Sequence, residues 1–189
     1  MDVFEYVFVL VSIVVGLSLA RLLDGFARII HEPSAFKVYS VHLLWTVFTF
    51  VYLIWFWWFE YRFIEVQAWN FMLYLFIVLY SVLLYVICAI LFPPNLDSYD
   101  GFEGYFYSRK RWFFGLWALL YLVDIGDTAF KGEVYLEQLG LEYLVRTLFF
   151  FGLSIVAMVT DNRIFHTLLV IGISIYLYQT IVFLYWTAL

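Results

Sequence analysis

The sequence predicts an all-α, polytopic membrane protein that forms a compact bundle of six transmembrane helices. Of its 189 residues, 66% are hydrophobic and only 13% are charged, whereas a soluble domain carries about 25% charged residues. The apolar residues also fall into six long stretches, and a helix needs about 20 apolar residues to cross a hydrocarbon core about 30 Å thick. We therefore expect a single transmembrane domain, integral to the cell membrane, with the lipid bilayer as its main partner.

The spans are expected to follow one another with short connections. The first begins without the basic residues that open a cleaved signal peptide, and its apolar run is longer than such a signal, so it is expected to remain as a helix. The second ends in a group of tryptophans, side chains that favour the headgroup level of a bilayer. The third ends before Pro93 and Pro94, which cannot continue a helix. The expected spans are residues 3–27, 38–59, 68–92, 112–130, 141–160 and 164–187.

The longest connection is predicted at 93–111, and it ends in the basic run Arg109, Lys110 and Arg111 before the fourth span. This run is expected to orient the chain, and it can contact anionic lipid or a partner protein. Sorted by connection, seven lysines and arginines fall on this side of the membrane and three on the other. The positive-inside rule then places the first, third and fifth connections in the cytoplasm and both termini on the non-cytoplasmic side.

Ionisable side chains inside a span are costly unless they meet a partner or water, and here they gather in two places. The first place joins the first two helices, where Arg21 and Asp24 follow a ridge of small residues and His42 belongs to a polar stripe. We expect the ridge to face protein, and a short hairpin connection would bring His42 to Arg21 and Asp24. We name these three residues the inner cluster. The ridge consists of Ser12, Gly16 and Ala20.

The second place joins the fourth and fifth helices near the opposite face of the membrane. Asp127 precedes Lys131 by four residues and Glu142 precedes Arg146 by four, an order that favours ion pairs on one helix. Asp124 lies deepest and has no obvious partner, although Arg146 could reach Asp124 or Asp127 across the hairpin. We name these five residues the outer cluster.

Several kinds of function find no support in the sequence. A net charge of -5 without a basic stripe argues against nucleic acid. Cys88 is the only cysteine, which excludes an intrachain disulfide, and the spacing of the histidines and carboxylates predicts neither a metal site nor a cofactor. An intramembrane serine protease would need Ser154 and His166 at one depth, but we expect them at different depths. The sequence therefore predicts no enzyme.

The two clusters allow two functions. Carboxylates beside arginine and histidine inside a membrane are typical of ion and proton paths. The leading prediction is therefore a protein that conducts or transports a small ion or proton, with Asp124 as its most important residue. A chain of 189 residues leaves little room for a path in one bundle, so a homo-oligomer is expected. The alternative is a non-catalytic sensor or scaffold, in which the clusters hold helices together and a partner docks on 93–111.

Overall fold

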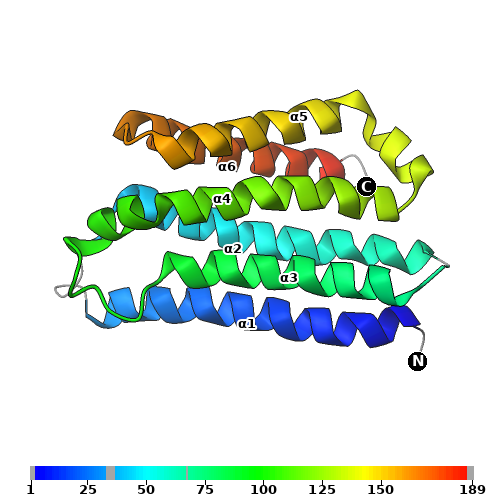
Figure 1. The fold of residues 1–189 in the computed structure, drawn as a ribbon, viewed down its shortest axis with the longest axis horizontal. Coiled ribbons are helices and arrows are strands. Elements are labelled where there is room, and N and C mark those ends of the chain that lie inside the picture. The colour runs from blue at the N-terminus through cyan, green and yellow to red at the C-terminus, as the bar shows by residue number, and fades with distance from the viewer. Residues whose placement is uncertain (1–2, 33–36, 67, 187–189) are drawn as a thin grey trace.

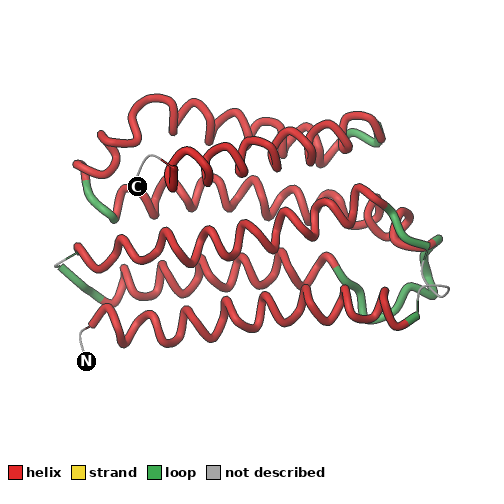
Figure 2. The backbone as a smooth tube through the Cα atoms, turned by 180° about the vertical axis from the view of Figure 1, so that it is seen from behind, coloured by secondary structure: helices red, strands yellow, loops and turns green. Residues whose placement is uncertain are grey.

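The computed structural model describes residues 3–32, 37–66 and 68–186, and every structural statement below refers to these residues. They form helices and connections, with no strand in the described part of the chain (Figures 1 and 2). Six of the helices are long and apolar enough to cross a membrane, as the sequence predicts. The elements are α1 (Val3–His31), α2 (Ser40–Glu60), the short 3-10 helix η1 (Tyr61–Glu65), α3 (Phe71–Leu91), α4 (Gly101–Phe130), α5 (Glu133–Val159) and α6 (Arg163–Trp186).

The helices run alternately up and down the bundle, so the connections gather at two ends (Figure 1). The termini end holds the start of α1, the α2–α3 and α4–α5 connections and the end of α6. The basic end holds the other three connections. The main pairings are α4 with α5 and α1 with α3, while α6 packs on α2 and has little contact with α5.

The centre of the bundle is aromatic. Trp45 on α2 contacts Phe113, Phe114 and Trp117 on α4, with ring centroids 5.2 to 6.0 Å apart. All four rings are almost fully buried. Edge-to-face and tilted ring pairs of this kind fill space densely, so a packed aromatic layer joins α2 to α4 in the middle of the bundle.

The fourth helix begins earlier than the sequence predicts. The predicted loop 93–111 is wrong in its second half, because α4 starts at Gly101 and only Phe92 to Asp100 connect it to α3. This segment contains many polar residues, but its apolar residues are spaced as in an amphipathic helix. Phe102, Tyr105 and Phe106 are buried on one face. The backbone N–H of Phe102 also donates to the carbonyl of Lys37 at 3.0 Å, which holds the helix start against the α1–α2 connection.

The fifth helix also begins earlier, at Glu133, and it bends at Gly140. Gly140 has φ 67° and ψ −172°, a conformation that residues with a side chain rarely adopt. The apolar stretch that predicts a start near residue 141 therefore corresponds to the second part of α5, after the bend.

Replacing Gly140 with alanine is expected to lower the free energy of unfolding by about 1–2 kcal/mol, because of its backbone conformation alone. An added Cβ would meet nothing within 4 Å there. Gly152 is the matched control, since it lies in the regular part of α5 and a Cβ there also meets nothing. Thermal unfolding of both purified variants in detergent measures the difference, and equal shifts would contradict a strained backbone at Gly140.

The small-residue ridge of the first helix does not face protein within this chain, so that prediction is wrong. Ser12, Gly16 and Ala20 are all exposed. The close approach to α1 occurs instead at Gly25, where an added Cβ would lie 2.2 Å from the Phe92 ring. The face of α1 that packs on the bundle consists of Val7, Phe8, Val11, Val15, Ser18, Leu22 and Gly25.

Candidate functional site

A cavity lies between α2, α4, α5 and α6, with Tyr80 of α3 also in its wall, in the half of the bundle near the termini end. Its volume is about 140 Å³, which is room for several water molecules, since one needs about 10–15 Å³ on this measure. Four residues of the outer cluster line it together with many aromatic rings: Asp124, Asp127, Lys131 and Arg146. We treat this cavity as the candidate site.

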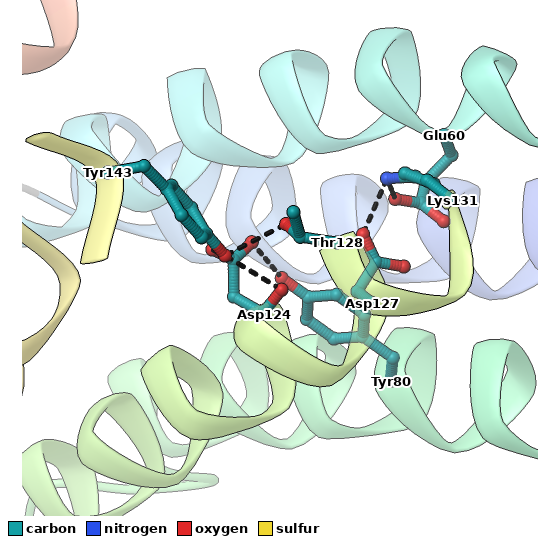
Figure 3. A network of polar contacts seen from close by, with 7 residues as sticks. All are labelled: Glu60, Tyr80, Asp124, Asp127, Thr128, Lys131 and Tyr143. Carbon is teal, nitrogen blue, oxygen red and sulfur yellow. Dashed lines mark hydrogen bonds and ion pairs between the residues drawn. The ribbon is translucent and has the colours of Figure 1, made fainter. Parts of the chain in front are cut away.

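The first polar group in the cavity is a buried ion triad (Figure 3). The Nζ atom of Lys131 lies 2.8 Å from Oε1 of Glu60 and 2.5 Å from Oδ2 of Asp127, and the three side chains are only 2 to 3% exposed. Burial alone would lower the pKa of Lys131, but the two neighbouring carboxylates outweigh it and raise the pKa above the ordinary lysine value. Lys131 is therefore charged at neutral pH, and its ammonium group is paired with both carboxylates.

The second polar group surrounds Asp124, which lies one helical turn before Asp127 on α4 and therefore deeper in the bundle. The hydroxyl of Tyr80 donates to Oδ1 at 3.2 Å, and the hydroxyl of Tyr143 lies 2.8 Å from Oδ2 and 2.9 Å from the Asp124 carbonyl oxygen (Figure 3). Thr128 in turn donates to the Tyr143 hydroxyl at 2.8 Å. Among the described residues, no lysine, arginine or histidine forms an ion pair with Asp124. Its carboxylate is thus oriented by neutral donors and keeps its place in the cavity wall without a cation.

Arg146 lies on the α5 side of the cavity. Its Nε atom is 3.4 Å from Oε1 of Glu142, so the ion pair expected from the four-residue spacing forms. Its guanidinium also lies over the rings of Tyr143 and Tyr176, 5.3 Å from each centroid. The expected contact of Arg146 with Asp124 or Asp127 does not form within the described part of the chain, because Glu142 and these two rings hold the guanidinium.

Glu60 is a site residue that sequence reasoning missed. It ends α2 after a run of aromatic residues, and this position suggested the headgroup region. No local signal in the sequence pointed to Glu60, since a buried lysine needs a counter-charge and Asp127, four residues before Lys131, already supplies one. Only the packing of α2 beside α4 shows that Glu60 supplies the second one.

The cavity reaches the middle of the bundle and stops there. Its deepest lining residues are Phe48 on α2, Tyr121 on α4 and Ile173 on α6. Beyond them lies the buried aromatic layer around Trp45 and Phe114. The cavity is therefore closed toward the basic end.

The inner cluster assembles only in part. Arg21 lies 3.8 Å from Asp24, but its NH2 group donates to the carbonyl of Phe92 at 2.8 Å. His42 does not join them, so that prediction is wrong: its Nε2 atom lies 2.7 Å from the carbonyl of Leu91, and its ring stacks on Phe102. The reason is that α3 ends beside α1 and α2 here, and the last carbonyls of a helix have no partner within it.

The basic run of the fourth helix splits in two. Lys110 turns into the bundle, where its Nζ atom donates to the Thr160 carbonyl at 2.7 Å and to the Asp161 carboxylate. This contact holds the pKa of Asp161 below its ordinary value. Arg109 and Arg111 are exposed, and Arg109 donates to the Tyr99 hydroxyl at 3.0 Å. Lys110 thus joins α4 to the α5–α6 connection at the basic end, while Arg109 and Arg111 remain exposed.

The other residues weighed in the sequence have separate local roles. The hydroxyl of Ser154 donates to the Phe150 carbonyl at 2.8 Å, and Nε2 of His166 lies 3.0 Å from the Thr160 carbonyl. No group of three or more histidine, cysteine or carboxylate side chains in the described ranges could hold a metal ion. Comparison with protein-family models, curated proteins and solved structures finds no match to this chain.

Proposed function

We propose that the protein conducts or transports a small cation, the proton included, through a path that begins in the cavity at the termini end. The observation that carries the proposal is Asp124. This carboxylate lies within α4, lines a cavity large enough for water, and is held by tyrosine hydroxyls instead of a cation. A carboxylate at such a depth is costly, and a charged or proton-bearing species in the cavity offsets that cost.

The charge balance of the cavity favours a cation over an anion. Glu60 and Asp127 share Lys131, and Glu142 pairs with Arg146. Asp124 adds a further negative charge to a region in which carboxylates already outnumber cations. A low-dielectric cavity with net negative charge concentrates positive ions.

The aromatic layer around Trp45 and Phe114 closes the second half of the path. Passage through a single bundle requires these rings to move. By the positive-inside rule, the cavity lies in the non-cytoplasmic half of the membrane and the basic end lies in the cytoplasm. Association of several copies, with Arg109 and Arg111 exposed at the basic end for lipid or a partner, belongs to the same proposal.

Replacing Asp124 with asparagine is expected to lower ion or proton flux by about tenfold or more, since removing one well-placed charge is worth at least about 1.4 kcal/mol. The full chain is reconstituted in liposomes, and flux of H⁺, Na⁺ and K⁺ is followed under imposed gradients. Asparagine keeps the size of the side chain, so the hydrogen bond from Tyr80 can persist. Gel filtration and thermal unfolding of the same samples establish that the variant is folded.

The control variant is Glu137→Gln, which removes one negative charge from an exposed position on α5 that does not line the cavity. We expect its flux to equal that of the wild type. Wild-type liposomes without flux above empty ones, or full flux in folded Asp124→Asn, would contradict the proposal and favour the scaffold alternative.

A further inference from the structure

We infer that the cavity binds an organic ammonium ion with apolar substituents, held between the Asp124 carboxylate and the surrounding aromatic rings. The inference rests on the proposed function in one respect, since it takes the cavity as a site for a cation. It goes further by assigning the chemical class of that cation. Three features of the cavity support it.

The first feature is the wall. Rings from five helices line the cavity around Asp124, and they include Tyr52, Tyr80, Tyr121, Tyr143, Phe150 and Tyr176. Tyr121 stacks on Phe150, with centroids 6.0 Å apart, and Phe150 meets Tyr176 edge to face at 5.5 Å. Rings that are fixed against one another present preorganised faces, and the faces of aromatic rings attract organic cations.

The second feature is that the same wall already holds an organic cation. The Arg146 guanidinium lies over Tyr143 and Tyr176 at 5.3 Å from both centroids, inside the range of cation–π contacts. The side chain of Arg146 is engaged by these rings and by Glu142, so it does not neutralise Asp124. Asp124 is therefore free to serve as the counter-ion of a second cation in the cavity.

The third feature is the shortage of oxygen ligands. A dehydrated metal cation needs about six oxygens, or a ring of carbonyls that replaces its water shell. In the described ranges, no group of carboxylates and histidines is arranged to hold a metal ion. The two tyrosine hydroxyls nearest Asp124 use their hydrogens on its oxygens. One carboxylate among aromatic faces suits an ammonium ion, which needs a single counter-charge and apolar surroundings.

The exposed part of the cavity lining suits an organic ammonium ion with an apolar substituent. The partly exposed lining residues lie on several helices, among them Trp55 and Phe59 on α2, Arg146 on α5 and Tyr176 on α6, so the rim of the cavity includes α5 and α6. Both helices face lipid over much of their length, with many exposed apolar residues. An ammonium ion with an apolar substituent partitions to the bilayer interface and can enter from there.

The test uses benzyltrimethylammonium and its uncharged carbon analogue neopentylbenzene, which has the same shape. Labelled benzyltrimethylammonium is equilibrated with the full chain in lipid nanodiscs, and empty nanodiscs give the background. We expect saturable binding that unlabelled benzyltrimethylammonium displaces and neopentylbenzene does not. The affinity should fall about tenfold in Asp124→Asn, about threefold in Phe150→Leu, and should not change in Glu137→Gln.

The outcomes separate this inference from the proposed function. Absence of saturable binding, equal displacement by neopentylbenzene, or unchanged affinity in folded Asp124→Asn would overturn the inference. If proton or metal-ion flux still depends on Asp124 in that case, the proposed function stands with a different cargo. If binding depends on Asp124 but no flux is measured, the ligand site stands and the proposed transport function is contradicted. If Asp124→Asn does not fold, the competition on the wild type and the Phe150→Leu variant decide.

Discussion

Replacing Lys131 with methionine is expected to cost about 3–5 kcal/mol of folding free energy, the usual effect of removing one partner from a buried ion pair. Lys131 is 3% exposed, and both of its partners, Glu60 and Asp127, are equally buried. Methionine fills most of the same space but leaves two carboxylates without a cation. The loss is electrostatic, because little packing is removed.

Thermal unfolding in detergent and the yield of folded protein measure this effect. The matched control is Lys37→Met, since Lys37 pairs with Asp100 at the surface, where both side chains are about 80% exposed. Such exposed pairs contribute about 0–1 kcal/mol, so the control should unfold near the wild-type temperature.

A combined variant separates charge from packing at this site. Glu60→Gln and Asp127→Asn in the Lys131→Met background remove the stranded charges, and we expect much of the lost stability to return. No recovery in the combined variant, or a loss in Lys131→Met as small as in the control, would contradict a stability role for the ion triad.

Replacing Gly25 with leucine is expected to destabilise the bundle by about 3 kcal/mol, through overpacking of a filled interface. Even the first atom of a side chain would lie 2.2 Å from the Phe92 ring. That ring is 2% exposed and is confined by His42 and Phe102, with centroids 5.3 and 5.9 Å away. It cannot move aside without disturbing the junction of α1, α2 and α3.

Gly16→Leu on the same helix is the control, because Gly16 is exposed and an added Cβ meets nothing within 4 Å. There leucine should be neutral or slightly stabilising, since it is a better helix former than glycine by up to about 1 kcal/mol. Thermal unfolding of the two variants compares them directly. If Gly16→Leu proves the more damaging, the small-residue ridge has a packing role that this single chain does not show.

Only those contacts of the candidate site that lie within one helix could be predicted from the sequence. Spacing along a helix revealed the pairs Asp127 with Lys131 and Glu142 with Arg146, because residues four apart lie on one helix face whatever surrounds them. Contacts between helices could not be predicted in this way. Glu60 joins Lys131 across 71 positions of sequence, and Tyr80 reaches Asp124 across 44. No local pattern encodes such pairings.

The boundaries of the helices show the same division. Hydropathy located the first three spans closely, but it placed the start of α4 near 112 and that of α5 near 141. Residues 101–111 and 133–139 are polar enough to resemble loops. Residues 101–111 are helical because apolar side chains such as Phe102 and Phe106 pack in the core. Residues 133–139 form the first part of α5, before the bend at Gly140, and none of their side chains is fully buried.

The sequence alone predicted six helices long and apolar enough to cross a membrane, with charged residues near both ends of the bundle, and the structure has six such helices. Hydrophobicity is a property of each segment alone, and the length of a helix follows from the thickness of the bilayer. The tertiary structure decided which helix faces meet protein, so that Gly25 is buried and Gly16 is not, and it gathered Glu60, Asp124 and the tyrosines around one cavity. The physical reason is that lipid and protein interiors are equally apolar, so hydropathy does not distinguish a lipid-facing side of a helix from a packed one.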